Sequence, residues 1–447
     1  MIFTRDKNFY RDLRHLAIPM ALGNLITFLI TLTDSIVVGR IGDEAIVGVF
    51  AGGLVATTLQ MFIAGIEGGV TLGISQYFGK GEREPIKKIF SVGTLSIFLF
   101  ATLLFAASFF VPDKISSLLI KGSSSSNSYL KLLSISFPIY ALSGAIGAAL
   151  RGVEKPGIVT FASFVAFVTN LIFDILLAFG KLGFTKMGIS GTAAATILAR
   201  SCELIILVLY LIFKDKQIGV RLKKPFSFDK KISFDFLKYT SPIVIGQLIW
   251  IFNTLFSSYV FSSFSSNAAI TGLSVANTLN SLSYIALNGL SGAVGIIIGK
   301  TVGEGKTQKL KEYAYTVEVI FAVLGVITSL LLLVSKNPFV SLYNISDEAV
   351  SLAKSLISVL AFTVIGTSYQ LACLVGLVRG GGDTSFILKN DAAFIFLFVV
   401  PLTVLALKLN APIPLVFLAL KSDQILKCIP AAIKINRFKW VKNLTHR

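Results

Sequence analysis

Long apolar segments follow one another along nearly the whole chain, separated by short polar loops. A transmembrane helix needs about 20 predominantly apolar residues, and these segments are of that order or longer. Because no alternating strand pattern is present, the pattern predicts an all-α integral membrane protein rather than a β-barrel. Twelve transmembrane helices are expected, at about 14–39, 46–78, 89–112, 129–150, 157–180, 188–213, 234–262, 268–299, 313–335, 351–378, 387–407 and 412–434.

The sequence also contains an internal repeat. Residues 19–29 (PMALGNLITFL) resemble residues 242–252 (PIVIGQLIWIF), with Pro19 opposite Pro242. Six helices in each repeat keep both halves in the same orientation, which is the parallel type of transporter repeat. We therefore expect two pseudo-symmetric six-helix lobes at 1–213 and 237–434, a cytoplasmic linker at 214–236, and a basic cytoplasmic tail at 435–447 that frays.

Composition supports the membrane assignment and explains the charge. The chain is 54% hydrophobic and 14% charged, with a mean hydropathy of +0.80 and a net charge of +18. A charge of this size could indicate a nucleic-acid partner. However, Lys and Arg concentrate in the loops on the side of both termini, as the positive-inside rule requires. We expect a multi-pass plasma-membrane protein with both termini in the cytoplasm, in contact with lipid and not with nucleic acid.

A few ionisable or polar side chains interrupt the apolar segments of the first half. Asp34 lies in the first segment and Asp174 in the fifth, with Asn170 four residues before Asp174 on the same helix face. Thr192 and Thr196 are four apart on a face of small residues in the sixth segment. A charge inside the bilayer costs about 2.5–3.5 kcal/mol on insertion scales, so each needs a reason. Two carboxylates, an amide and a hydroxyl are suited to holding a proton or Na⁺.

Glu67, in the second segment, is a weaker candidate for the same coupling-cation site. Arg200 and Glu203 are three residues apart in the sixth segment and are expected to pair with each other. The three cysteines are dispersed and form no CxxC motif, so neither a disulfide framework nor a metal site is expected. No organic cofactor is expected.

The second half carries amides and aromatic side chains in place of acids. They could line a wide amphipathic substrate cavity through π faces and weak hydrogen bonds, although ordinary helix packing is an equal alternative for each residue taken singly. The candidates for this cavity are Gln247, Asn253, Asn280, Tyr284 and Asn288.

At these residues the chain resembles the MATE family (multidrug and toxic compound extrusion) of the exporter superfamily that also includes lipid-linked oligosaccharide flippases. The resemblance covers about residues 10–435 and is carried by segments 19–42, 68–82, 150–196 and 378–384. It implies two six-helix lobes arranged as a V, and antiport coupled to H⁺ or Na⁺. It also implies a cation site and a helix bend at matching positions: Asp34, Asn170, Asp174 and Thr192 for the cation, and Pro19 for the bend.

One departure from the family pattern concerns the second half. Some members place a Glu in the seventh helix as part of a second cation site, whereas the segment GQLIWIFNTLF at 246–256 holds no acid. Coupling is therefore expected in the first half alone.

Two functions follow from these observations. The first is a secondary active antiporter, not an enzyme, that exports organic cations or amphipathic drug-like compounds by alternating access. The alternative is a lipid-linked oligosaccharide or other lipid flippase, which would need a strongly cationic cavity, whereas few Arg or Lys lie inside the apolar segments. A monomer would suffice for either, because one chain already supplies two lobes.

Overall fold

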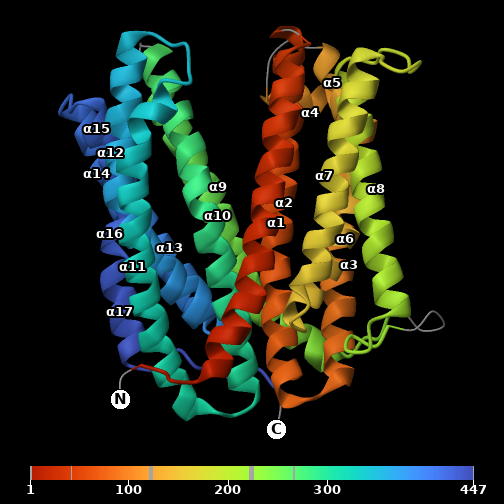
Figure 1. Cartoon of the computed structure of the whole chain (residues 1–447), viewed down its shortest axis with the longest axis vertical. Coiled ribbons are helices and arrows are strands. Elements are labelled where there is room, and N and C mark those ends of the chain that lie inside the picture. The colour runs from red at the N-terminus through yellow and green to blue at the C-terminus, as the bar shows by residue number, and fades with distance from the viewer. Residues whose placement is uncertain (1–2, 42, 120–123, 221–225, 265–266, 446–447) are drawn as a thin grey trace. The chain divides into compact units, whose positions relative to one another are not determined.

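The computed structural model describes residues 3–41, 43–119, 124–220, 226–264 and 267–445. These residues form helices, and the β-structure among them is one isolated bridge between Gly382 and Val441. The chain divides into two compact units, one of residues 22–244 and one of residues 1–21 with 245–447 (Figure 1). The predicted all-α class is confirmed.

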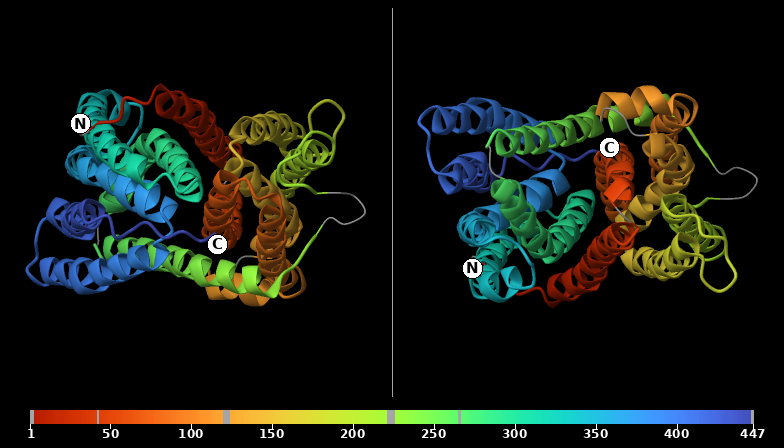
Figure 2. Two further views of the ribbon diagram at one scale, coloured as in Figure 1. Left: turned by 90° about the horizontal axis from the view of Figure 1, so that it is seen from below. Right: turned by 90° about the horizontal axis from the view of Figure 1, so that it is seen from above.

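The unit of residues 22–244 is a bundle in which α2 packs on α3 and α6, and α7 packs along α8 (Figure 2). Local sequence sets the helix ends. Pro156 occupies the first turn of α7, where its missing N–H costs nothing, and Gly180 ends α7 in the left-handed conformation with φ 67°. The helices are α1 (Lys7–Gly39), which enters the unit at residue 22, α2 (Asp43–Lys80), α3 (Arg83–Phe110), α4 (Pro112–Leu119), α5 (Ser124–Ser134), α6 (Ser136–Gly152), α7 (Pro156–Phe179) and α8 (Ile189–Phe213).

The other unit is built around the packing of α12 on α10 and α11. Its helices are α9 (Lys230–Ser262), which enters the unit at residue 245, α10 (Asn267–Gly303), α11 (Thr307–Val340), α12 (Asp347–Gln370), the π-helix η1 (Leu371–Arg379), α13 (Thr384–Phe394), the π-helix η2 (Ile395–Val399), α14 (Val400–Lys408), α15 (Ile413–Leu420), α16 (Asp423–Leu426) and α17 (Cys428–Asn436).

Eleven helical spans in the described residues are long and apolar enough to cross a membrane. The segment predicted as a twelfth, continuous helix at 412–434 is instead the succession α15, α16 and α17. Lys421, Asp423, Gln424 and Lys427 fall at its breaks, where polar side chains engage other helices. The serines from Ser124 onward form the start of α5.

Two long helices belong to both compact units. The division falls within α1 between residues 21 and 22, and within α9 between residues 244 and 245. Pro19 and Pro242 lie inside these helices close to the division, where proline lacks the N–H of the helical ladder. The predicted bend at Pro19 and the lobe boundaries 1–213, 214–236 and 237–434 stay predictions.

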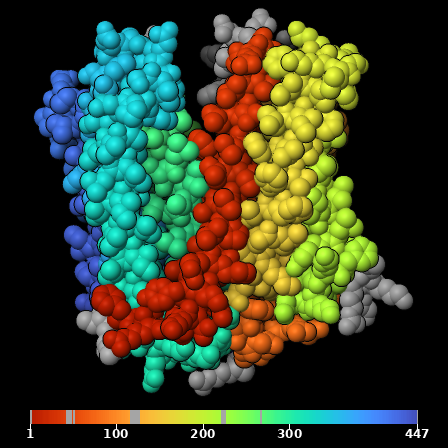
Figure 3. All heavy atoms as spheres, in the orientation of Figure 1, coloured from red at the N-terminus to blue at the C-terminus, as the bar shows by residue number. Residues whose placement is uncertain are grey.

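The N-terminal residues 4–9 pack against α11 (Figure 3). The backbone N–H of Thr4 donates to the hydroxyl of Thr316 at 2.9 Å, and Lys309 pairs with Asp6 at 2.7 Å. The hydrogen bond from Lys309 lowers the pKa of Asp6 below its ordinary value, against a smaller opposing effect of burial. Phe9 stacks on Tyr313 with ring centroids 4.5 Å apart.

The expectation that the basic tail frays is wrong for the described residues. Trp440 is fully buried against Gly381, and the backbone N–H of Lys442 donates to the carbonyl of Gly381 at 2.6 Å. The carboxylate of Asp383 forms two ion pairs, from Oδ2 to Nζ of Lys434 at 2.7 Å and from Oδ1 to Nζ of Lys442 at 2.6 Å. Burial raises the pKa of Asp383, but the two lysine hydrogen bonds outweigh it and leave that pKa below its ordinary value.

Candidate functional site

A cavity of about 570 Å³ lies within the unit of residues 22–244. The helices α1, α2, α5, α6, α7 and α8 contribute to its wall. The side chains that bear on its chemistry are Asp34, Gln60, Tyr129, Tyr140, Asn170, Thr192, Thr196 and Arg200. A cavity of this size, with an apolar wall and a few convergent polar groups, has the usual character of a small-molecule site.

The close packing of α7 against α8 positions two of these groups. A Cβ at Gly191 would lie 2.6 Å from the backbone carbonyl carbon of Leu177, so only glycine permits this approach. Ala193 and Ala195, on the same helix, are also fully buried. Thr192 on α8 and Asn170 on α7 both line the cavity.

Asp34, Asn170 and Asp174 lie together. Asp34 is close enough to interact directly with both Asp174 and Asn170. Asp174 is fully buried and Asn170 is 1% exposed, while Asp34 reaches the cavity wall. Among the described residues, Oδ1 of Asp34, both carboxylate oxygens of Asp174 and both side-chain polar atoms of Asn170 lack a hydrogen-bond partner of acceptable geometry. Such atoms are rare in folded proteins, and an ordered water or a bound ion commonly satisfies them.

The two threonines present oxygen acceptors to the same cavity. The hydroxyl of Thr192 donates to the carbonyl of Ile189 at 2.8 Å, and the hydroxyl of Thr196 donates to the carbonyl of Thr192 at 3.0 Å. Each hydroxyl has one hydrogen, so its oxygen remains available only as an acceptor. Carboxylate, amide and hydroxyl oxygens are hard donors suited to a proton or a hard cation.

Glu67 lies elsewhere. It does not line the cavity, and its Oε2 accepts a hydrogen bond from Nη2 of Arg151 on α6 at 2.7 Å. The expected pairing of Arg200 with Glu203 is confirmed, at 2.8 Å. Sequence reasoning missed that Arg200 also faces the cavity. Its position four residues after Thr196, on the same face of α8, was the available signal.

The second-half candidates all lie in the other unit, on α9 and α10. Oδ1 of Asn253 is buried without a hydrogen-bond partner among the described residues, and Asn288 is exposed. The hydroxyl of Tyr284 accepts a hydrogen bond from Gln424 at 3.3 Å. Gln247 is on α9 with Asn253, and Asn280 is on α10 with Tyr284 and Asn288.

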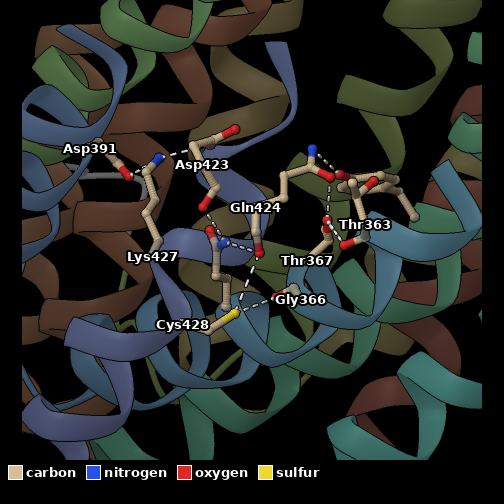
Figure 4. Close-up of polar contacts among 10 residues, drawn as sticks. Thr363, Gly366, Thr367, Asp391, Asp423, Gln424, Lys427 and Cys428 are labelled. Atoms are coloured by element: carbon tan, nitrogen blue, oxygen red, sulfur yellow. Dashed lines mark hydrogen bonds and ion pairs between the residues drawn. The ribbon is translucent and has the colours of Figure 1, made fainter. Parts of the chain in front are cut away.

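Sequence reasoning did not reveal the polar network that Tyr284 joins. Figure 4 shows Lys427 between Asp391 and Asp423, at 2.9 Å and 3.0 Å respectively. Gln370 on α12 donates to the carbonyls of Asp423 and Gln424, within the broken segment between α15 and α17. The signal was a lysine and an aspartate four residues apart inside an apolar segment. The network holds the broken helix against α12 and α13.

No group of three or more His, Cys, Asp or Glu side chains suited to a metal ion occurs among the described residues. A coupling Na⁺ would therefore rely on the mixed oxygen set of Asp34, Asn170, Asp174 and Thr192. These residues fit it chemically, because the polar atoms of Asn170 and Asp174 lack partners and Thr192 can only accept.

Comparison with known proteins gives concordant results. The sequence profile of the family described as MatE matches residues 19–176 and again residues 242–405, which confirms the internal repeat. A probable multidrug resistance protein NorM of Thermotoga maritima is 24% identical over 387 residues, covering 84% of this chain and 80% of that protein. The probable multidrug resistance protein YoeA of Bacillus subtilis is 24% identical over 361 residues, covering 78% and 77%.

Solved structures share the fold. A crystal structure of MATE in complex with MaL6 superposes with a TM-score of 0.87 at 18% identity, covering 96% of this chain and 97% of that chain. The bent form of the Vibrio cholerae MATE transporter VcmN superposes with a TM-score of 0.84 at 17% identity, covering 96% and 97%.

Proposed function

Because the chain belongs to the MatE family of transporters, we propose that it is a secondary active antiporter that exports small organic molecules in exchange for H⁺ or Na⁺. Export of drug-like molecules is supported by two relatives named probable multidrug resistance proteins. The proposed substrates are organic cations or other amphipathic compounds, which suit a cavity lined by Asp34, Tyr129 and Tyr140. The coupling cation binds at Asp34, Asn170, Asp174 and Thr192, with Thr196 beside them. Transport proceeds by alternating access between two conformers that differ in their affinity for the cation.

The observation that carries this proposal is the set of unpartnered oxygen atoms at Asp34 and Asp174. Leaving a buried polar group unsatisfied costs about 1–3 kcal/mol, and more when the group is charged. Two carboxylates that adjoin one another without a bound cation are therefore unfavourable. A proton or Na⁺ relieves both the repulsion and the missing hydrogen bonds, so the site favours loading.

The proposed cavity suits a small amphipathic substrate. Its volume of about 570 Å³ is in the range of drug-sized ligand sites. Tyr129 and Tyr140 offer aromatic faces, and Asp34 offers a negative charge to an organic cation. A substrate cation and a coupling cation at Asp34 would then compete, which is the requirement for exchange. The amides and Tyr284 of the other unit form a second proposed substrate surface.

The proposed orientation follows from the basic loops. Both termini are placed in the cytoplasm. A membrane potential of 100 mV, negative inside, favours cation entry by about 2.3 kcal/mol per charge. In a plasma membrane this supplies the driving force for export. One chain is the proposed functional unit.

The test is efflux of ethidium from energised cells that express the chain, with proton and Na⁺ gradients imposed separately. The variants are Asp34→Asn and Asp174→Asn. The matched control is Asp347→Asn, which changes an exposed acid at the start of α12. We expect efflux in the wild type and the control, driven by one of the two gradients, and loss of that dependence in both site variants.

Efflux that keeps its gradient dependence in both site variants would contradict the cation site. A folded, membrane-inserted wild-type protein that moves no cationic dye would contradict drug export and favour the lipid-flippase alternative.

A further inference from the structure

Arg200 carries a permanent positive charge at the wall of the proposed cation cavity. Its guanidinium lies over the ring of Tyr140, 4.6 Å from the centroid, and its Nη1 donates to Oε2 of Glu203 at 2.8 Å. The side chains of Arg200 and Glu203 are 17% and 8% exposed. Arg200 therefore belongs to the interior of the unit and not to its surface.

Glu203 is held from two helices. Ser163 on α7 donates to its Oε1 at 2.8 Å, while Arg200 occupies Oε2. Both carboxylate oxygens are thus engaged, and Glu203 is fixed as the partner that keeps Arg200 on its side of the cavity. Asp34, on α1, lines the same cavity as Arg200.

Apart from Glu67, which Arg151 compensates, Arg200 has two negative neighbours, one with its hydrogen bonds satisfied and one without. Glu203 is paired directly, whereas Oδ1 of Asp34 lacks a partner among the described residues. A guanidinium close to the acids opposes an incoming cation, because interactions between charges are strong in a poorly solvated site. The pairing of Arg200 with Glu203 therefore decides how strongly Arg200 opposes that cation.

We propose that Arg200 is an internal competitor of the coupling cation, and that Glu203 sets the affinity of the cavity by holding Arg200 away from Asp34. This inference rests on the proposed cation site. When a proton or Na⁺ occupies the acids, Arg200 stays with Glu203. When the cation leaves, the guanidinium moves toward Asp34, compensates its charge and opposes rebinding of the cation.

The ionisable groups around Arg200 and its neighbours Asp34 and Glu67 come from six helices. They are Asp34 on α1, Glu67 on α2, Tyr129 on α5, Tyr140 and Arg151 on α6, Asp174 on α7 and Glu203 on α8. Glu67 is compensated by Arg151 at 2.7 Å, so Glu203 and the cavity acids are the anions left to share Arg200. The proposal therefore predicts opposite changes in cation affinity when Arg200 and Glu203 are replaced.

The experiment measures cation affinity in purified protein by two probes. One is binding of radioactive Na⁺ at fixed pH, and the other is infrared titration of buried carboxyl groups by protons in Na⁺-free buffer. Arg200→Gln removes the competitor and is expected to tighten binding of the coupling cation about tenfold, equivalent to about 1.4 kcal/mol. Glu203→Gln releases Arg200 toward Asp34 and is expected to weaken it by a similar factor.

The double variant R200Q/E203Q is expected to resemble R200Q, because Glu203 acts only through Arg200. Arg200→Lys keeps the positive charge, and its cation affinity is expected to stay within about threefold of the wild type. This variant therefore distinguishes an effect of the charge from an effect of side-chain packing. A merely structural ion pair would lower stability in both single variants and shift cation affinity in the same direction, or not at all.

Asp174→Asn distinguishes failure of the proposed cation site from failure of the role proposed for Arg200. Equal cation affinity in the wild type and D174N would contradict the cation site itself. If D174N abolishes cation binding while R200Q and E203Q leave the cation affinity unchanged, only the role proposed for Arg200 is overturned. If R200Q does not fold, the comparison of E203Q with R200K decides the matter, and unchanged affinity in E203Q overturns the proposal.

Discussion

Arg151 at the end of α6 donates to Glu67 on α2 at 2.7 Å, so this acid of the second helix has its counter-charge within the same unit. Both side chains are about one-fifth exposed, at 24% for Arg151 and 19% for Glu67. The pair ties two helices together beside Gly144, whose Cβ would meet the Glu67 carboxylate. Glu67 thus differs from Asp34 and Asp174, which have no cationic hydrogen-bond partner among the described residues.

Glu67→Gln is expected to lower stability and to leave gradient-driven efflux in place. Removing one partner of a partly buried charged hydrogen bond costs about 1.5–3 kcal/mol. Thermal unfolding in detergent measures the loss, and the double variant E67Q/R151Q is expected to lose less than the two single variants together. Loss of coupled efflux in E67Q, with stability unchanged, would restore Glu67 as a coupling residue.

Asp174→Asn is expected to stabilise the protein in Na⁺-free buffer at alkaline pH, where neither Na⁺ nor a proton occupies the site. A buried carboxylate without a partner penalises the folded state, and the neutral amide removes the charge at nearly constant volume, for a gain of about 1–3 kcal/mol. Active sites commonly sacrifice stability in this way. Thermal unfolding is the measurement. Asn170→Asp is the matched control, since a third acid at the same place should lower stability. A lower melting temperature in D174N would contradict the account.

Lys427→Met is expected to be strongly destabilising. Lys427 is 1% exposed and bridges Asp391 and Asp423, so its removal leaves two buried carboxylates uncompensated, at a cost of about 3–5 kcal/mol. Lys408→Met, at an exposed lysine of the same unit, should change stability little. Unfolding of both variants in detergent tests the difference. Equal stability would mean that the bridge contributes nothing.

The docked C-terminal tail is expected to loosen in acid. Asp383 has a pKa held below its ordinary value of 3.8 by Lys434 and Lys442, so its ion pairs stabilise the tail above that value. This stability is lost as the pH falls through the lowered pKa. The fluorescence of buried Trp440 in a Trp250→Phe background should shift to the red over that range. Asp383→Asn should show the shifted emission already at neutral pH. Identical titrations in both proteins would contradict the assignment.

Several features could be read from the sequence because they depend on local pattern. Segment length and hydrophobicity predict membrane helices, since the bilayer demands internally satisfied backbone hydrogen bonds. The repeat at Pro19 and Pro242 follows from residue identity alone. Intramembrane charge singled out Asp34 and Asp174, and the spacing of four placed Asn170 with Asp174 on one face. The pairing of Arg200 with Glu203 followed from helical spacing as well.

Other features depended on which helices meet. Nothing in the local sequence around Glu67 indicates that Arg151, 84 residues later, compensates it. The break at 421–428 looks like continuous apolar helix in the sequence. Only the structure shows that Gln370 on α12 binds carbonyls of the break and that Asp391 on α13 pairs with its Lys427. The docking of Trp440 likewise needs the Gly381 backbone to receive it.

The sequence by itself therefore determined the class, the repeat and the positions of the intramembrane acids, because hydrophobic length and helical periodicity act within one segment. Only the tertiary structure decided which acids are compensated and which are left without partners. That distinction arises from pairings between distant segments, whose energies depend on burial and on distances of a few ångströms. It separates Glu67, held by Arg151, from Asp34 at the cavity wall and from the buried Asp174.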